Sequence, residues 1–270
     1  MLRFRSLLAV LALILAVSFT LGGCGSAVNA WKGDVLRVGV DDTYPPMEYR
    51  DEQNNLVGFD VDMAKAVGEK LGVKVEFVPI AWDGIFPALD ANKFDCIISS
   101  ASMNKDRLNN FIFSKPYMSN GQYIVVKPSD NSITKPEDLK GKKVGAQVNT
   151  TSSKAAERYQ KTTEFTLTTY DQVIQPFAEL KTGRIDAIVV DEMVAKDYQS
   201  KEPESYKVTT AKLTNEPVGV VFSKINTELR DKVDKALNDL RSEGALKQIS
   251  EKWLQGEDRT SNIDETVTED

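Results

Sequence analysis

The chain has 270 residues, of which 41% are hydrophobic and 27% are charged, as in soluble globular proteins with one large or two ordinary domains. It has no histidine and only two cysteines, which excludes Ser–His and Cys–His catalytic sites and a structural zinc site. An enzyme would have to use Asp, Glu, Lys or Tyr. The net charge of −6 argues against nucleic acid as a partner.

The first 23 residues have the pattern of a secretory signal peptide. Arg3 and Arg5 precede the apolar run 7–17, and the segment ends in Leu21-Gly-Gly-Cys24. The run is too short for a stable membrane-spanning helix. Its last four residues resemble the bacterial lipobox, in which the Cys becomes the lipid-modified first residue of the mature protein. Plain secretion after cleavage is the alternative.

Removal of the signal peptide makes the chain more acidic. Residues 1–23 hold two of the 34 basic residues and no acid, so 32 Lys and Arg remain against 40 Asp and Glu, a net charge of −8. Lipid on Cys24 leaves Cys96 without a partner, and its apolar surroundings in the sequence predict a buried free thiol. Residues 24–33 are mostly small and polar, and we expect them to form a lipidated tether.

Strands and helices alternate after the tether. We expect strands at 34–40, 73–80 and 94–99, and helices at 58–71 and 82–91. Pro45 and Pro46 follow the first strand, and prolines cannot continue a sheet ladder. This alternation predicts a parallel sheet covered on both faces, with ligands bound at the carboxyl ends of its strands.

The third strand leads into an unusual stretch, Asp95–Arg107. Its apolar residues give way to hydroxyl side chains, Asn104 can cap the next helix, and Arg107 lies in that helix's first turn. Backbone N–H groups, hydroxyls and a guanidinium at such a point can hold a small carboxylate. An ordinary strand-to-helix turn with a surface Arg is the alternative.

A second alternating unit begins at Lys142, after an outgoing strand at 123–126. Its strands are expected at 143–146, 165–169, 185–190 and 206–209, and its helices at 150–159, 171–181 and 191–200. The chain then returns through an apolar strand at 216–222 and ends in helices at 227–241 and 245–254. The residues from Glu257 onward are acidic and without periodicity, so we expect a disordered tail at 257–270.

These two units predict two lobes. Residues 34–120 and 217–256 would form a discontinuous first lobe, and residues 121–216 the second. A chain that leaves one lobe and re-enters it makes a two-segment hinge, and two hinged lobes form a cleft that can close around a ligand.

Several motifs in this order resemble one family. They are the Tyr-Pro-Pro that follows the first strand, Gly58-Phe-Asp-Val-Asp62, the serines and Arg of 99–107, Lys135-Pro-Glu-Asp-Leu-Lys-Gly-Lys142, Gly183-Arg-Ile-Asp-Ala187 with Asp191, and Glu228-Leu-Arg-Asp-Lys-Val233. From about Val35 to Leu254 the chain resembles the bacterial extracellular solute-binding proteins of family 3, the amino-acid receptors of ABC importers. The resemblance implies a type II-like periplasmic-binding-protein fold, with two three-layer α/β lobes and a two-segment hinge.

The resemblance also implies how the ligand's carboxylate is held. Arg107 matches the Arg that grips the α-carboxylate, and Ser102 and a backbone N–H of Thr150–Thr151 complete that anion site. A helix N-terminus offers unpaired donors, which agrees with this role. The family usually has Gly at the position of Asn149, and Asn can also adopt a positive φ.

Asp191 matches the acid that pairs with the ligand's α-ammonium, helped by Ser100. Asp191 also follows a strand and opens a helix, so a role as helix N-cap is the alternative. Asn149 in place of Gly would add a side chain near this pocket.

The ligand's side chain would meet a different set of residues. Tyr44 and Trp82 match aromatic positions that sandwich it, although Trp82 could instead be part of the core. Asp41 matches a deep carboxylate that favours a cationic partner, and Gln147 adds a polar contact. Arginine or lysine is therefore the expected ligand, with glutamine next. We interpret three further acids as surface charges without a role: Asp42, Glu48 and Glu192.

The implied function is high-affinity binding of a free L-amino acid outside the cytoplasm and its delivery to an ABC-importer permease. We expect a lipid-anchored monomer without cofactor, metal or enzymatic activity. Two alternatives are a dehydratase of the same fold that acts on cyclohexadienyl acids, and a sensor that presents its ligand-bound state to a separate signalling protein.

Overall fold

The computed structural model describes residues 31 and 33–267. Cys24 and the signal peptide lie outside the described residues. No helix within the described part of the chain is long and apolar enough to span a membrane. All the elements below belong to one compact unit that begins at Gly33.

The first lobe is built on a mixed five-stranded sheet. Its strand order is β5 (Lys74–Pro79), β1 (Val35–Val40), β6 (Cys96–Ile97), β15 (Val221–Phe222) and β7 (Ile112–Phe113). The first three strands are parallel, as the sequence predicts, whereas β15 runs antiparallel to both of its neighbours. The sheet is therefore mixed because the returning segment adds a strand of opposite direction.

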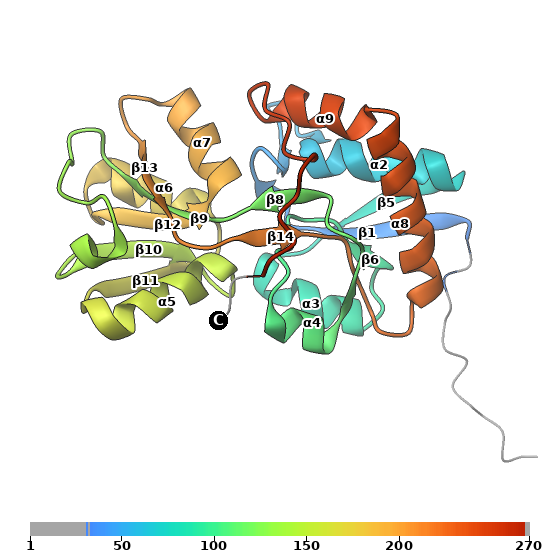
Figure 1. Ribbon diagram of the computed structural model, residues 1–270, viewed down its shortest axis with the longest axis horizontal. Coiled ribbons are helices and arrows are strands. Elements are labelled where there is room, and N and C mark those ends of the chain that lie inside the picture. The colour runs from blue at the N-terminus through green and yellow to red at the C-terminus, as the bar shows by residue number, and fades with distance from the viewer. Residues whose placement is uncertain (1–30, 32, 268–270) are drawn as a thin grey trace, which may run out of the picture. The chain divides into compact units, whose positions relative to one another are not determined.

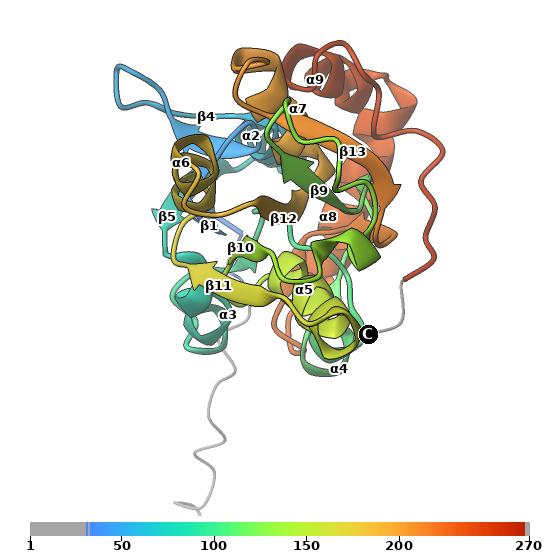
Figure 2. The ribbon, with the colours of Figure 1, turned by 90° about the vertical axis from the view of Figure 1, so that its left-hand side faces the viewer.

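The second lobe repeats this plan. Its sheet has the order β11 (Thr166–Tyr170), β10 (Lys143–Gln147), β12 (Ala187–Asp191), β9 (Gln122–Val126) and β13 (Lys207–Lys212). Here β10, β11 and β12 are parallel, and β9 is antiparallel to β12 and β13. Figure 2 shows this sheet with α5 (Thr151–Thr163) on one side and α6 (Ile174–Thr182) and α7 (Glu192–Lys201) on the other.

Helices also cover both faces of the first sheet. On one side lie α2 (Phe59–Leu71), α8 (Thr227–Ser242) and α9 (Ala245–Trp253), and on the other α3 (Trp82–Asp90) and α4 (Lys105–Asn110) (Figure 1). The right-handed rule for such crossovers places α2 and α3 on opposite faces, because the chain moves to opposite neighbours of β1 in turn. A three-stranded sheet of β2 (Thr43–Tyr44), β3 (Glu48–Arg50) and β4 (Leu56–Val57) precedes α2, and a 3-10 turn, Pro136–Leu139, precedes β10.

Two strands connect the lobes. The outgoing β8 (Met118–Asn120) pairs antiparallel with the returning β14 (Glu216–Val218), and Figure 1 shows both between the two sheets. Each lobe has its own apolar cluster, one around Phe94, Ile97 and Val221 and another around Ile124, Val144 and Val189. The expected two-lobe α/β fold is confirmed.

Two single-residue expectations are also confirmed. Asn104 caps α4, since its Oδ1 accepts the backbone N–H of Arg107 at 2.8 Å. Cys96 is a buried free thiol. The third strand, Cys96–Ile97, is shorter than the predicted range 94–99, and the left-handed Ser100, with φ at 47°, follows it.

The expectation of a disordered C-terminal tail is wrong for residues 257–267. They run without secondary structure but are held by hydrogen bonds to the rest of the fold, and Thr260 is almost completely buried. An acidic, aperiodic composition predicts disorder only when no partner surface exists, and here Lys196 and Arg241 supply donors.

Gly39 allows the backbone of β1 to lie directly against the ring of Phe94. A Cβ at this position would lie 2.5 Å from two ring atoms of Phe94, which is itself buried. Gly84 in α3 is a matched contrast, since a Cβ there would meet only Ile80 at 3.8 Å.

We therefore expect Gly39→Ala to lower the free energy of unfolding by about 1–3 kcal/mol through overpacking. Gly84→Ala should leave it unchanged or raise it by up to about 1 kcal/mol. Urea denaturation of both variants provides the test, and equal effects would contradict this packing argument.

Candidate functional site

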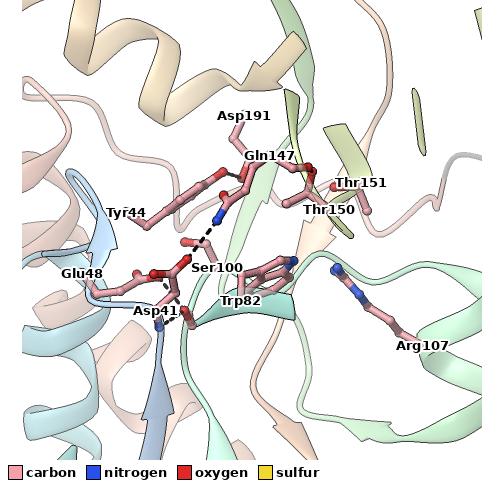
Figure 3. Close-up of a pocket in the computed structure, with 11 residues that line it drawn as sticks. Asp41, Tyr44, Glu48, Trp82, Ser100, Arg107, Gln147, Thr150, Thr151 and Asp191 are labelled. Carbon is pink, nitrogen blue, oxygen red and sulfur yellow. Dashed lines mark hydrogen bonds between the residues drawn. The ribbon is translucent and has the colours of Figure 1, made fainter. Parts of the chain in front are cut away.

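A cavity lies where the two lobes face each other. Its walls come from the carboxyl ends of β1, β6, β10 and β12, from β2 and β3, and from the first residues of α3, α4 and α5. Figure 3 shows the side chains that line it. The lining residues are Asp41, Tyr44, Glu48, Trp82, Ser99, Ser100, Arg107, Gln147, Thr150, Thr151 and Asp191. Nine of the ten residues predicted as ligand contacts are among them, and Ser102 is the exception.

Ser100 is held in a left-handed conformation that non-glycine residues seldom adopt. Its N–H and Oγ both donate to Oδ2 of Asp60, at 2.6 and 3.1 Å. Asp60 lies in the first turn of α2, so the Gly58-Phe-Asp start of that helix positions the serine on the cavity wall. Burial raises the pKa of Asp60 to about 6.

Arg107 has a buried guanidinium beside two neighbouring aromatic rings. Its Cζ lies 5.1 Å from the ring centroid of Trp82 and 4.8 Å from that of Phe86. Its Nη1 donates to the backbone oxygen of Ser102 at 2.8 Å. Cation–π contacts and this hydrogen bond fix the side chain and leave it among the residues that line the cavity.

Ser102 is buried but does not line the cavity. It forms an isolated antiparallel bridge with Val218, and its carbonyl accepts the Arg107 guanidinium. Residues two apart share a face in an extended chain, but the left-handed φ of 47° at Ser100 breaks this alternation between Ser100 and Ser102. The structure therefore places Ser102 behind Arg107.

Asp191 lies at the end of β12 and is the N-cap residue of α7, but its carboxylate makes no capping hydrogen bond. It accepts the hydroxyl of Tyr44 at 2.7 Å and Nε2 of Gln122 at 2.5 Å. Burial, and then the nearby charge of Glu216, raise its pKa to about 6. A buried carboxylate with a raised pKa is complementary to a cation.

Asp41 occupies the end of β1. Nε2 of Gln147, from the other lobe, donates to its Oδ2 at 3.0 Å, and Thr43 donates to its Oδ1 at 2.6 Å. Burial raises the pKa of Asp41. The Oε1 atom of Gln147 is buried and has no hydrogen-bond partner among the described residues.

Further contacts join the lobes around the cavity. Nε1 of Trp82 donates to the backbone oxygen of Asn149 at 3.0 Å, and Lys154 pairs with Asp106 at 2.5 Å. With Tyr44–Asp191 and Gln147–Asp41, these bonds define a closed arrangement of the two lobes. Asn149 has a φ of 57°, the positive value that its sequence position suggested.

The start of α5 contributes the two threonines. Oγ1 of Thr150 accepts the N–H of Ser153 at 3.1 Å, so Thr150 is the cap of this helix. Oγ1 of Thr151 accepts Nε2 of Gln122 at 3.1 Å. The start of α5 thus lines the cavity, and the backbone N–H groups of a helix start that remain unpaired can bind an anion.

Two lining residues were missed from the sequence. Glu48 is completely buried rather than a surface charge, and Ser99 Oγ donates to its Oε1 at 2.6 Å and accepts the N–H of Asp41 at 3.0 Å. Burial, and then Asp60, raise the pKa of Glu48 well above its usual value. An acid in a strand of three residues gives no sequence signal of burial, because the partner Ser99 is distant in the chain.

The surface assignment is wrong for Glu192 as well. Glu192 is buried and pairs with Lys196 at 3.0 Å and with Arg259. Asp42 is partly exposed and pairs with Arg50 at 2.8 Å.

Charge is unevenly distributed over the cavity. Three carboxyls, from Asp41, Glu48 and Asp191, face one guanidinium, from Arg107, among the described lining residues. Arg107 belongs to the first lobe and Asp191 to the second. A small molecule with a carboxylate and at least one ammonium group has the complementary charges.

Comparisons with known proteins agree with this geometry. The family model of the bacterial extracellular solute-binding proteins, family 3, matches residues 36–256. The L-cystine-binding protein TcyJ of Escherichia coli K12 is 33% identical over 220 residues, which are 81% of this chain and 82% of TcyJ. The ABC transporter arginine-binding protein 1 of the same strain is 30% identical over 249 residues, 91% of this chain and 98% of that protein.

Solved structures show the same fold. An ancestral arginine-binding protein bound to arginine has a TM-score of 0.78 and 43% identity, over 81% of this chain and 97% of its own. The ancestral amino acid-binding protein AncCDT-1, a precursor of cyclohexadienyl dehydratase, has a TM-score of 0.77 and 38% identity, over 82% of this chain and 95% of its own. The chain therefore belongs to the bacterial extracellular solute-binding proteins of family 3.

Proposed function

We propose that this protein binds a polar or cationic L-amino acid outside the cytoplasm and delivers it to the permease of an ABC importer. The observation that carries the proposal is the placement of Arg107 and Asp191 on opposite lobes of one buried cavity. Arg107 holds the α-carboxylate, together with the start of α5 at Thr150 and Thr151. Asp191 holds the α-ammonium with Ser100.

Cleft closure follows from this arrangement. Each lobe alone offers only part of the ligand's partners, so all contacts form only when the lobes come together. A ligand that binds the closed form more tightly shifts the population toward it. The permease then distinguishes the closed form from the open one.

The ligand's side chain is proposed to be that of arginine or lysine, with glutamine second. Asp41 and Glu48 line the same cavity, and Arg107 is the one basic side chain among its described lining residues. A cationic ligand side chain therefore offsets part of the free-energy cost of burying these two acids. Tyr44 and Trp82 supply the aromatic faces, and Gln147 a polar contact. The cystine-binding relative makes a neutral ligand the competing choice.

We also propose that Cys24 carries a lipid and holds the protein, as a monomer, at the outer face of a cell membrane. The Leu21-Gly-Gly-Cys24 sequence and the family's extracellular placement support this. The lobe limits are proposed as 34–120 with 217–256 and 121–216, which agrees with the positions of β8 and β14.

A dehydratase is the second candidate, because Glu48 is a buried cavity acid with a raised pKa and one structural relative is a dehydratase precursor. A protonated carboxyl can serve as a general acid. Glu48, however, is engaged by Ser99 beside Asp60, and Asp191 remains in place for an ammonium. Release of water from cyclohexadienyl acids at a rate above that of the Glu48→Gln variant would support the dehydratase.

Arg107→Ala and Asp191→Asn should each weaken binding of the cognate amino acid by at least about 30-fold, since each leaves a buried charge of the ligand unpaired. Calorimetric titration with each of the common amino acids measures this. Arg184→Ala, which removes an exposed Arg paired with Glu179, is the control and should bind normally. A wild-type protein that binds no free amino acid would contradict the proposal.

Asp41→Asn should change the ligand preference. Loss of this carboxylate should weaken the binding of arginine and of lysine by about tenfold or more, which corresponds to about 1.4 kcal/mol. The affinity for glutamine should change little. Competition titrations of the three amino acids on the variant and the wild type provide the test. An equal loss for all three would show that Asp41 shapes the cavity without selecting charge.

Acidification should act on affinity and stability in opposite directions. Below pH 6 the Asp191 carboxylate is protonated in the ligand-free protein, so affinity should fall by up to about tenfold per pH unit. Because its folded pKa of about 6 exceeds the ordinary value of 3.8, the folded state binds the extra proton, and this group adds stability as pH falls from 6 toward 4.

Thermal melts with and without ligand at pH 7 and pH 5 measure both effects. The stabilisation by ligand should shrink at pH 5. Asp191→Asn should remove part of the pH dependence in each series, and an unchanged pH dependence in this variant would assign the effect to Asp60 or Glu48.

A further inference from the structure

Residues 257–267, here called the C-terminal strap, lie beyond the part of the chain that matches the family model, which ends at residue 256. The chain leaves α9 through Gln255 and Gly256, both with positive φ, and reverses direction. Figure 1 shows the strap, in dark red, passing across β8 and β14 between the two lobes.

The strap is anchored to the first lobe through α8 and α9. Oγ of Ser250 donates to the backbone oxygen of Glu257 at 2.7 Å and accepts the N–H of Arg259 at 2.9 Å. Nε of Arg241 donates to the oxygen of Thr260 at 3.2 Å. Ser250 and Thr260 are both almost fully buried, so this anchor is part of the packed structure.

The strap also forms ion pairs with α7 of the second lobe. Nζ of Lys196 contacts both carboxylate oxygens of Glu257, at 2.8 and 3.0 Å, and Arg259 pairs with Glu192. The Glu192 side chain is only 9% exposed and that of Arg259 21%. Burial alone would raise the pKa of Glu192, but the charges of Arg259 and Lys196 hold it below its ordinary value.

The strap also binds the segments that join the lobes. The N–H of Ser119 in β8 donates to the oxygen of Arg259 at 3.2 Å. Nδ2 of Asn215, just before β14, donates to the oxygens of Asp264 and Thr266 at 3.4 and 2.9 Å. Val267 then packs against the apolar cluster of the first lobe. One segment thus contacts both lobes, the crossover strand β8 and the residue that precedes β14.

Opening of the cleft rotates one lobe relative to the other about the crossover strands. The anchor on α8 and α9 moves with the first lobe, whereas Glu192 and Lys196 move with the second. Contacts that differ between two states shift the equilibrium between them. Glu192 directly follows Asp191, so the Arg259 pair also fixes the helix start that presents this acid to the cavity.

We propose that the C-terminal strap fastens the two lobes in the closed arrangement and slows release of the bound molecule, with Arg259 as a positioning residue for Asp191 through Glu192. This deepens the proposed function and rests on it for the identity of the released ligand. The strap's effect on the opening of the lobes stands independently of that identity.

Arg259→Ala, Glu192→Gln and a chain that ends at Gly256 test the strap against Arg184→Ala, which removes an Arg–Glu pair within the second lobe. Stopped-flow tryptophan fluorescence with arginine gives association and dissociation rates. Arg259→Ala should raise the dissociation rate about 5- to 30-fold, with association almost unchanged. The double variant with Glu192→Gln should release ligand at nearly the rate of Arg259→Ala, because the Arg259–Glu192 pair is already lost and the other pair of Glu192, with Lys196, lies within α7.

A ligand-free measurement separates the strap from the proposed function. Spin labels at Lys93→Cys and Lys161→Cys, exposed positions on the two lobes, report the inter-lobe distance in full-length protein carrying Cys24→Ser. Arg259→Ala and truncation should both increase the population at longer distances. If no amino acid binds the wild type, the proposed ligand is wrong. The inter-lobe distance of the ligand-free protein then tests the strap by itself. An unchanged distance distribution, or dissociation as slow as in Arg184→Ala, would overturn the proposal.

Discussion

The enclosure of several acids around a single guanidinium is the constraint on which the rest of this structure depends. Asp41, Glu48 and Asp191 share one cavity with Arg107, and Asp60 lies directly behind. Taking carboxylates out of water costs several kcal/mol each unless a cation compensates. Their raised pKa values express this cost. An amino acid, with a carboxylate and an ammonium group, carries both complementary signs of charge.

The two-lobe architecture supplies the means to build and to open such a cavity. Each sheet has its own apolar core, so each lobe keeps its side-chain positions as a unit. Within the described residues, the backbone passes from one sheet to the other through β8 and β14 with their flanking residues. Tyr44, Trp82 and Gln147 then form hydrogen bonds across the gap. The C-terminal strap adds a second bridge, from α9 to α7, and the balance between the open and closed forms depends on all of these contacts.

Much of the fold could be predicted from local patterns. The alternation of apolar strands and amphipathic helices predicts two α/β units, and Asn104 and Asn149 adopt the cap and the positive φ that their residue types favour. The errors lie where partners are distant. Glu48 and Glu192 are buried acids because Ser99 and Arg259 meet them in space, and no neighbouring residue signals this.

The sequence by itself determined the alternation of the longer strands and helices, the family and the residue types that gather at the strand ends, because strand period, helix caps and motif order are properties of neighbouring residues. Only the tertiary structure decided which side chains meet. Tyr44 and Asp191 are 147 positions apart, and their hydrogen bond depends on how closely two separate lobes approach. The same holds for the strap, whose acidic, aperiodic residues are ordered by basic side chains that the fold brings beside them.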